Sequence, residues 1–120
     1  MLYGKYYYEF SCWSLHAVNP AIMAAEETVG VVQGLTVELE VYVSGYPVPI
    51  SSQITWSDPD GSELSDATVG VDLQDGGRRL ILSNVQTRQA GQYECTVLLS
   101  SSPYMGATAY IQLNVYGKKV

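Results

Sequence analysis

Apolar and polar residues alternate in short runs along much of the chain, which is typical of β-strands with one buried face. The clearest run covers residues 35–43, whose apolar side is formed by Leu35, Val37, Leu39, Val41 and Val43. The positions between them carry threonine, glutamate and tyrosine, side chains that suit the water side of a sheet. The pattern therefore predicts a long, half-buried strand in this part of the chain.

The same alternation predicts further strands at residues 28–32, 53–57, 69–73, 79–83, 93–97 and 109–115. Segments rich in glycine, proline or serine separate them, at residues 44–49, 58–61, 75–77 and 100–106, and we expect loops or turns there. Asn19-Pro20 is expected to break the chain, because proline lacks an amide donor and restricts the residue before it. Residues 24–27 have the propensity for one helical turn.

Four features, in order, carry a family resemblance. A Gly-x-x-Val-x-Leu strand runs into Val-Ser-Gly-Tyr-Pro over residues 34–47, a tryptophan follows at position 56, Leu-x-Leu-Ser-Asn-Val covers 80–85 and Ala-Gly-x-Tyr-x-Cys covers 90–95. Together they resemble an immunoglobulin-like domain, most closely the intermediate or I-set type. The resemblance implies an all-β fold, an immunoglobulin-like two-sheet antiparallel β-sandwich with Greek-key connections over residues 20–117. Residues 1–19 would then be a leader or N-terminal extension, and residues 118–120 a tail.

The resemblance also assigns a structural core, whose members are Val41, Trp56, Leu82, Tyr93 and Cys95. Tyr93 takes the position of the family's tyrosine corner, so its hydroxyl is expected to bond to backbone within residues 85–91. Trp56 is expected to pack against the sulfur of Cys95. Truncation of Trp56 to alanine should therefore cost about 3–5 kcal/mol and unfold a domain of marginal stability.

Two departures from the family pattern change the expected stability and compartment. Val41 stands where the family has its first cysteine, so the usual bond between the sheets to Cys95 cannot form. Gln89 stands where the family usually has an acid, so a salt bridge there is replaced at best by a neutral hydrogen bond. The remaining cysteine, Cys12, lies outside the matched region, and we favour a buried free thiol at Cys95 over a Cys12–Cys95 bond. A free thiol suits a reducing cytoplasm, although extracellular members without the bond also exist.

Composition and charge exclude several classes of function. The 120 residues fit one domain, and a net charge of -6 would repel a phosphate backbone, so nucleic acid is a poor candidate partner. No apolar run approaches the roughly 20 residues of a membrane-spanning helix, so a membrane would be reached only through other parts of a longer chain. A signal peptide in residues 1–17 is disfavoured by Glu9 and the adjacent tyrosines.

Catalytic chemistry has little support in the sequence. The single histidine, His16, and Cys12 are near in sequence but lack an orienting third group, which makes an enzyme the weakest hypothesis. No cysteine and histidine spacing suits zinc, and Asp58-Pro59-Asp60-Gly61 lacks the later ligands of a calcium loop. We therefore expect no cofactor and no metal site.

Tyrosine-bearing loops leave protein binding as the leading function. Tyr104 and Met105 are expected in the loop after the strand of Cys95, and Tyr46 and Val48 in the loop after residue 43, both at one end of the sandwich. These four residues are the candidate protein-binding site, although Tyr46 could simply brace its loop. The leading hypothesis is a recognition or cell-adhesion module of an immunoglobulin-superfamily receptor, extracellular or at the cell surface, with homophilic binding open. The alternative is a structural spacer of an intracellular muscle or cytoskeletal protein.

Overall fold

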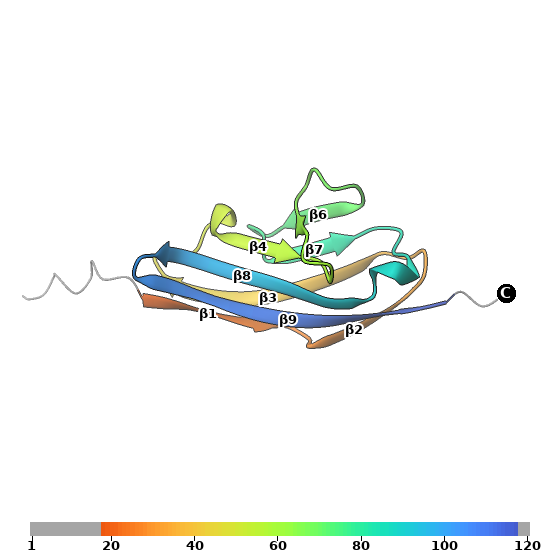
Figure 1. The fold of residues 1–120 in the computed structure, drawn as a ribbon, viewed down its shortest axis with the longest axis horizontal. Coiled ribbons are helices and arrows are strands. Elements are labelled where there is room, and N and C mark those ends of the chain that lie inside the picture. Colours follow the sequence, from red (N-terminus) through yellow and green to blue (C-terminus); the bar gives the residue numbers. More distant parts are fainter. Residues whose placement is uncertain (1–17, 118–120) are drawn as a thin grey trace, which may run out of the picture.

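The computed structural model describes residues 18–117, which form two β-sheets packed face to face (Figure 1). The four-stranded sheet has the order β1 (Val18–Ala24), β3 (Val37–Tyr46), β7 (Arg79–Leu82) and β6 (Val71–Gln74). The five-stranded sheet has the order β2 (Thr28–Val32), β9 (Tyr104–Tyr116), β8 (Gly91–Ser101), β4 (Ile54–Ser57) and β5 (Glu63–Leu64). Two short 3-10 helices, η2 (Ser51–Gln53) and η3 (Thr87–Gln89), lie in connections. This is the predicted immunoglobulin-like β-sandwich.

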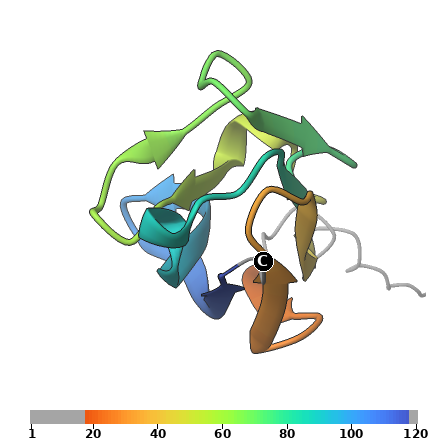
Figure 2. The ribbon, with the colours of Figure 1, turned by 90° about the vertical axis from the view of Figure 1, so that its right-hand side faces the viewer.

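The chain passes from one sheet to the other between β1 and β2. β1 pairs antiparallel with β3, whereas β2 pairs parallel with the last part of β9, from Thr28 opposite Gln112 to Val32 opposite Tyr116. Figure 2 shows β2 beside the C-terminal end of β9. The crossing is held by the Ala25 amide, which donates to the Glu40 carbonyl at 2.9 Å, and by the Gln112 amide, which donates to the Glu27 carbonyl at 2.8 Å. The helical turn considered for residues 24–27 is therefore absent. Every other strand pair in the described residues is antiparallel.

The predicted break at Asn19-Pro20 is wrong, because β1 runs through both residues. The proline is tolerated because β1 is the edge of its sheet and its pairing with β3 is irregular between Val18 and Ala21. Gly45 makes the irregularity possible, since a Cβ at this position would lie 3.1 Å from the Pro20 Cα and its φ is +152°. The two residues that were expected to break the chain therefore belong to an irregular strand pair.

Two further expectations need correction, and one strand was missed. Leu35 precedes β3 and is exposed, because Val32 and Leu35 close a turn by a 3.1 Å backbone hydrogen bond. Val69 is 99% exposed in a turn, and the strand predicted from it begins only at Val71. The short strand β5, which buries Leu64 against Trp56, was not predicted. These errors share a cause: alternation alone does not locate the ends of strands whose partners are distant in sequence.

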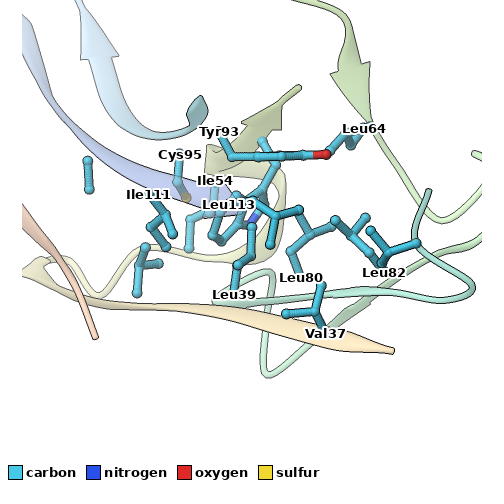
Figure 3. Close-up of a cluster of buried hydrophobic side chains, with 14 of the residues drawn as sticks. Val37, Leu39, Ile54, Leu64, Leu80, Leu82, Tyr93, Cys95, Ile111 and Leu113 are labelled. Carbon is cyan, nitrogen blue, oxygen red and sulfur yellow. The ribbon is translucent and has the colours of Figure 1, made fainter. Parts of the chain in front are cut away.

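The core lies between the two sheets and follows the predicted alternation. Figure 3 shows Leu39 and Leu80 of one sheet meeting Cys95 and Ile111 of the other. The fully or almost fully buried side chains include Leu39, Val41, Trp56, Leu80, Leu82, Val85, Tyr93, Cys95, Val97, Ile111 and Leu113. Every buried side chain within residues 18–117 is apolar or aromatic, so the sandwich is held together mainly by the hydrophobic effect.

Candidate protein-binding site at the hairpin end

The predicted polar loop at residues 100–106 is wrong, because β8 and β9 form one long hairpin. Ser101 pairs with Tyr104 and Ser100 with Met105, which leaves only two residues in the turn, and the register shifts between Leu98 and Ser100. The turn lies at the left end of the sandwich in Figure 1, which we call the hairpin end. Tyr104 and Met105 therefore sit on a strand rather than on a free loop.

The Tyr104 side chain covers part of the neighbouring backbone of its own strand. Its side chain is 64% exposed, yet a Cβ at Gly106 would lie 2.7 Å from the Tyr104 hydroxyl, so the side chain lies against the Gly106 backbone. Met105 is half-buried, and it faces the side opposite to Tyr104 because neighbouring strand residues alternate. The hairpin thus presents one aromatic side chain to solvent, while Met105 contributes less exposed area than expected.

The connection between β3 and β4 presents more apolar surface at the same end. Tyr46, Val48 and Ile50 are exposed, whereas Pro49 between them is buried. The Pro49 carbonyl accepts a hydrogen bond from the Arg78 guanidinium, Nη2 to O 2.8 Å. This contact anchors the connection to the turn after β6, so the exposed side chains stand on a fixed backbone.

The two segments lie at one end, as expected, but on different parts of it. The 3-10 helix η2 forms the last part of the β3–β4 connection and lies beside β8 of the hairpin (Figure 1). Tyr46 is the last residue of β3 and pairs with Val18 across the four-stranded sheet, whereas Tyr104 belongs to the five-stranded sheet. The arrangement offers a tyrosine-bearing end suited to contact with another protein.

Sequence reasoning missed exposed apolar side chains on the outside of the four-stranded sheet. Val18 and Met23 of β1 are exposed, as is Tyr42 of β3, which pairs with Met23. The alternation along residues 35–43 correctly placed Tyr42 on the water side. The neighbour of Tyr42 could not be found, because β1 was not predicted to be a strand.

The expected tyrosine corner is present at the start of β8. The Tyr93 hydroxyl donates to the Gln89 carbonyl at 2.7 Å, within the expected connection. The Gln89 side chain closes η3 by accepting from the Gln86 amide at 2.7 Å, so a neutral hydrogen bond does stand where the family usually has an acid. Burial raises the pKa of Tyr93 to about 12, and the negative charges of Asp58 and Asp60 make a smaller contribution in the same direction. The hydroxyl therefore remains a hydrogen-bond donor at every physiological pH.

Cys95 lies fully buried in β8 and forms no disulfide within residues 18–117. It pairs across the strands with Trp56, whose indole nitrogen donates to the Gly77 carbonyl at 2.7 Å. Val41 is equally buried in the opposite sheet. Burial raises the pKa of the Cys95 thiol to about 12, which keeps it protonated and unreactive.

The remaining candidates for chemistry gain no support. Residues 18 and 19 of the leader predicted at 1–19 belong to β1, and its other residues, Cys12 and His16 included, lie outside the described part of the chain. The Cys12–His16 pair and the Cys12–Cys95 bond therefore stay hypotheses. Between residues 18 and 117, no three histidine, cysteine, aspartate or glutamate side chains gather where they could hold a metal ion. Over the same range, no helix is long and apolar enough to cross a membrane.

Comparison with known proteins gives consistent matches. The family model described as "Immunoglobulin domain" matches residues 19–98. Neural cell adhesion molecule L1 of Takifugu rubripes is 30% identical over 109 residues, which cover 80% of this chain and 8% of that protein. Human hemicentin-1 is 30% identical over 105 residues, which cover 85% of this chain and 2% of that protein. The chain thus spans less than a tenth of these curated relatives.

Solved structures agree on the fold. A titin and obscurin-like 1 Ig complex superimposes with a TM-score of 0.70 at 24% identity, covering 86% of this chain and 99% of that one. At this identity the likeness concerns the fold alone.

Proposed function

The chain belongs to the immunoglobulin domain family, and from that premise we propose that it is a non-enzymatic protein-recognition module of the cell-adhesion class. Its partner is a protein, and its contact surface at the hairpin end includes Tyr46, Val48, Tyr104 and Met105. It acts at the cell surface or outside the cell, as the name of its adhesion-molecule relative suggests for that relative. Within the family, the domain is of the I-set type.

The observation that carries this proposal is the exposure of Tyr104 and Val48 on an anchored backbone. The Tyr104 side chain lies against Gly106, and the Val48 segment is held by the Arg78 to Pro49 hydrogen bond. Anchored tyrosine and aliphatic side chains can be buried by a partner at low entropic cost, because little freedom is left to lose.

The experiment compares the Tyr104→Ser/Met105→Ser double variant with Val69→Ser. Val69 is 99% exposed in the β5–β6 connection, so Val69→Ser removes apolar surface away from the proposed site. The full chain on beads is tested against purified cell-surface ectodomains and against itself, and thermal unfolding is recorded in parallel. We expect binding to fall about tenfold or more in the double variant only, with unfolding temperatures unchanged. Full binding by a folded double variant would place the site elsewhere.

A second function, a structural spacer of an intracellular filament protein, is favoured by one observation. Cys95 forms no disulfide within the described residues, and Val41 occupies the position where the family usually has the partner cysteine. A free thiol of this kind suits a reducing compartment. Intact mass after alkylation without reduction separates the two functions. Labelling of both cysteines in the unfolded chain supports the spacer, whereas a bond between Cys12 and Cys95 supports the extracellular module.

A further inference from the structure

The outer side of the four-stranded sheet carries an apolar groove between β1 and β3. Its most exposed members are Met23, at 64%, and Tyr42, at 55%, which pair across the two strands. The groove measures about 280 Å³ and is lined by Ala21, Ile22, Met23, Tyr42, Val43 and Ser44, all of them uncharged. An apolar patch rimmed by polar residues is a candidate interaction surface, and the identity of its partner follows from what surrounds it.

A second groove adjoins the first and is acidic. It measures about 380 Å³ and is lined by Ala25, Glu26, Val29, Glu38, Glu40 and Tyr42. Tyr42 therefore lines both grooves. Glu38, Glu40 and Tyr42 occupy alternate positions of β3 and so point to the same side of the sheet. We call the two grooves together the β1–β3 face.

The negative charge of this face is only weakly compensated. Arg79 approaches Glu38 with a nitrogen to oxygen distance of 3.5 Å, and both side chains are substantially exposed. Arg79 lies opposite Glu40 in the pairing of β3 and β7 but bonds to Glu38, so among the described residues the Glu26 and Glu40 carboxylates have no ion pair. A partner that brings a cation to them would gain contacts that the domain itself does not provide.

We propose that the β1–β3 face binds a basic protein segment in which an apolar side chain lies two residues from a lysine or arginine. Residues i and i+2 of an extended chain point to one side and are about 6.6 Å apart, which matches the spacing of Tyr42 and Glu40 along β3. The apolar side chain enters the groove against Met23, whose flexible thioether adapts to it. The cation lies between the Tyr42 ring and the Glu40 carboxylate.

Charge favours this partner over a second copy of the chain. The chain carries a net charge of -6, and a second copy docked through the same face would bring its own Glu26, Glu38 and Glu40 toward the first set. Like charges brought together in a partly desolvated interface oppose association. A basic segment reverses the sign of that interaction.

The test is a titration of the isotope-labelled full chain, followed by NMR, with a short peptide that contains Leu-Ser-Lys. Peptides with Leu-Ser-Glu or Ser-Ser-Lys in its place serve as controls. We expect amide shifts centred on β1 and β3 with the first peptide only. Shifts centred on other strands, equal shifts with Ser-Ser-Lys, or no shifts at millimolar peptide would overturn the proposal.

Variants separate specific contact from general charge attraction. Tyr42→Thr keeps a good strand former, and we expect it to weaken the Leu-Ser-Lys peptide about tenfold. Glu40→Gln should weaken it about threefold at low salt, with a smaller effect at 0.5 M salt. Glu63→Gln on β5 removes the same charge from the other sheet, and Leu35→Thr removes a comparable exposed apolar side chain, so neither should matter. Equal losses with Glu63→Gln and Glu40→Gln would contradict the assignment.

The outcome is independent of the hairpin-end proposal. Tyr104 and Met105 line neither groove, so the Tyr104→Ser/Met105→Ser variant is expected to bind the peptide normally. Self-association of the full chain that Tyr42→Thr abolishes would replace the basic partner with a second copy. Sedimentation velocity of the two proteins at equal concentration measures this directly.

Discussion

The hydroxyl of Tyr93 ties the beginning of β8 to the connection before it, and Tyr93→Phe removes that tie while keeping the buried ring. A hydrogen bond of this kind contributes about 1 kcal/mol net, and an unpaired carbonyl left behind costs about 1–3 kcal/mol when fully buried. Because Gln89 is only half-buried, water can reach part of its carbonyl. We therefore expect a loss of about 1–2 kcal/mol, or about 5–10 °C in unfolding temperature.

The assay is chemical and thermal unfolding followed by circular dichroism, with Tyr110→Phe as the matched control. Tyr110 undergoes the same chemical change but is 51% exposed on β9, and its hydroxyl makes no hydrogen bond to the described residues. The control should stay within about 0.5 kcal/mol of the parent chain. Equal effects of the two substitutions, or no effect of Tyr93→Phe, would refute the structural role of the hydroxyl.

The same variant has a pH signature. Since burial raises the pKa of Tyr93 from 10.0 to about 12, the folded state resists an ionisation that the unfolded state undergoes readily. The stability that depends on the neutral hydroxyl is fully present below pH 10 and is lost as pH rises toward 12. The difference between the parent and Tyr93→Phe should therefore shrink across this range. A difference that stays constant would mean that Tyr93 ionises as freely in the folded chain.

Three other substitutions or probes test the packing. Gly91→Ala should lower the free energy of unfolding by about 2–4 kcal/mol, because φ is +140° and the new Cβ would lie 2.7 Å from Pro59. Gly34 has a φ of +93° but open space around it, so Gly34→Ala should cost about 1 kcal/mol. Denaturant unfolding measures both values. The Cys95 thiol should resist a thiol reagent in the native chain and react once unfolded; rapid native labelling would contradict its burial. Trp56→Ala should cost about 3–5 kcal/mol, and a cooperative melt near the parent temperature would show that the indole is dispensable.

Alternation along the chain predicted most of the core, although it missed Leu64 and wrongly included Leu35 and Val69. Leu39, Val41, Tyr93 and Cys95 are buried as expected, because each belongs to a strand whose period-two pattern is local and needs no knowledge of its partner. The tyrosine corner also follows from a short motif, since donor and acceptor are only four residues apart. Patterns of this kind can be predicted because all of the residues that form them are close together in the sequence.

The edges and connections could not be predicted for the opposite reason. β1 forms only because β3 is available to pair with it and because Gly45 leaves room for Pro20, a match between residues 25 positions apart. The long β8–β9 hairpin likewise replaces a loop because Ser101 and Tyr104 pair directly across the turn, despite the serines and proline there. Tertiary pairing overrides local propensity at these places.

Both proposed surfaces depend on an unpredicted feature, strand β1 for one and the extended β8–β9 hairpin for the other, and Tyr46 lies where the two surfaces approach each other. Tyr46 ends β3 and pairs with Val18 of β1, so it borders the β1–β3 face, while its exposed side chain also belongs to the hairpin end. If both surfaces bind protein, Tyr46→Ser should weaken both interactions, whereas the Tyr104 and Tyr42 variants should each weaken one. Loss of one interaction alone would assign Tyr46 to that surface. A partner that covers both surfaces would instead make the effects of the Tyr104 and Tyr42 variants non-additive, because the two sites would then share one bound state.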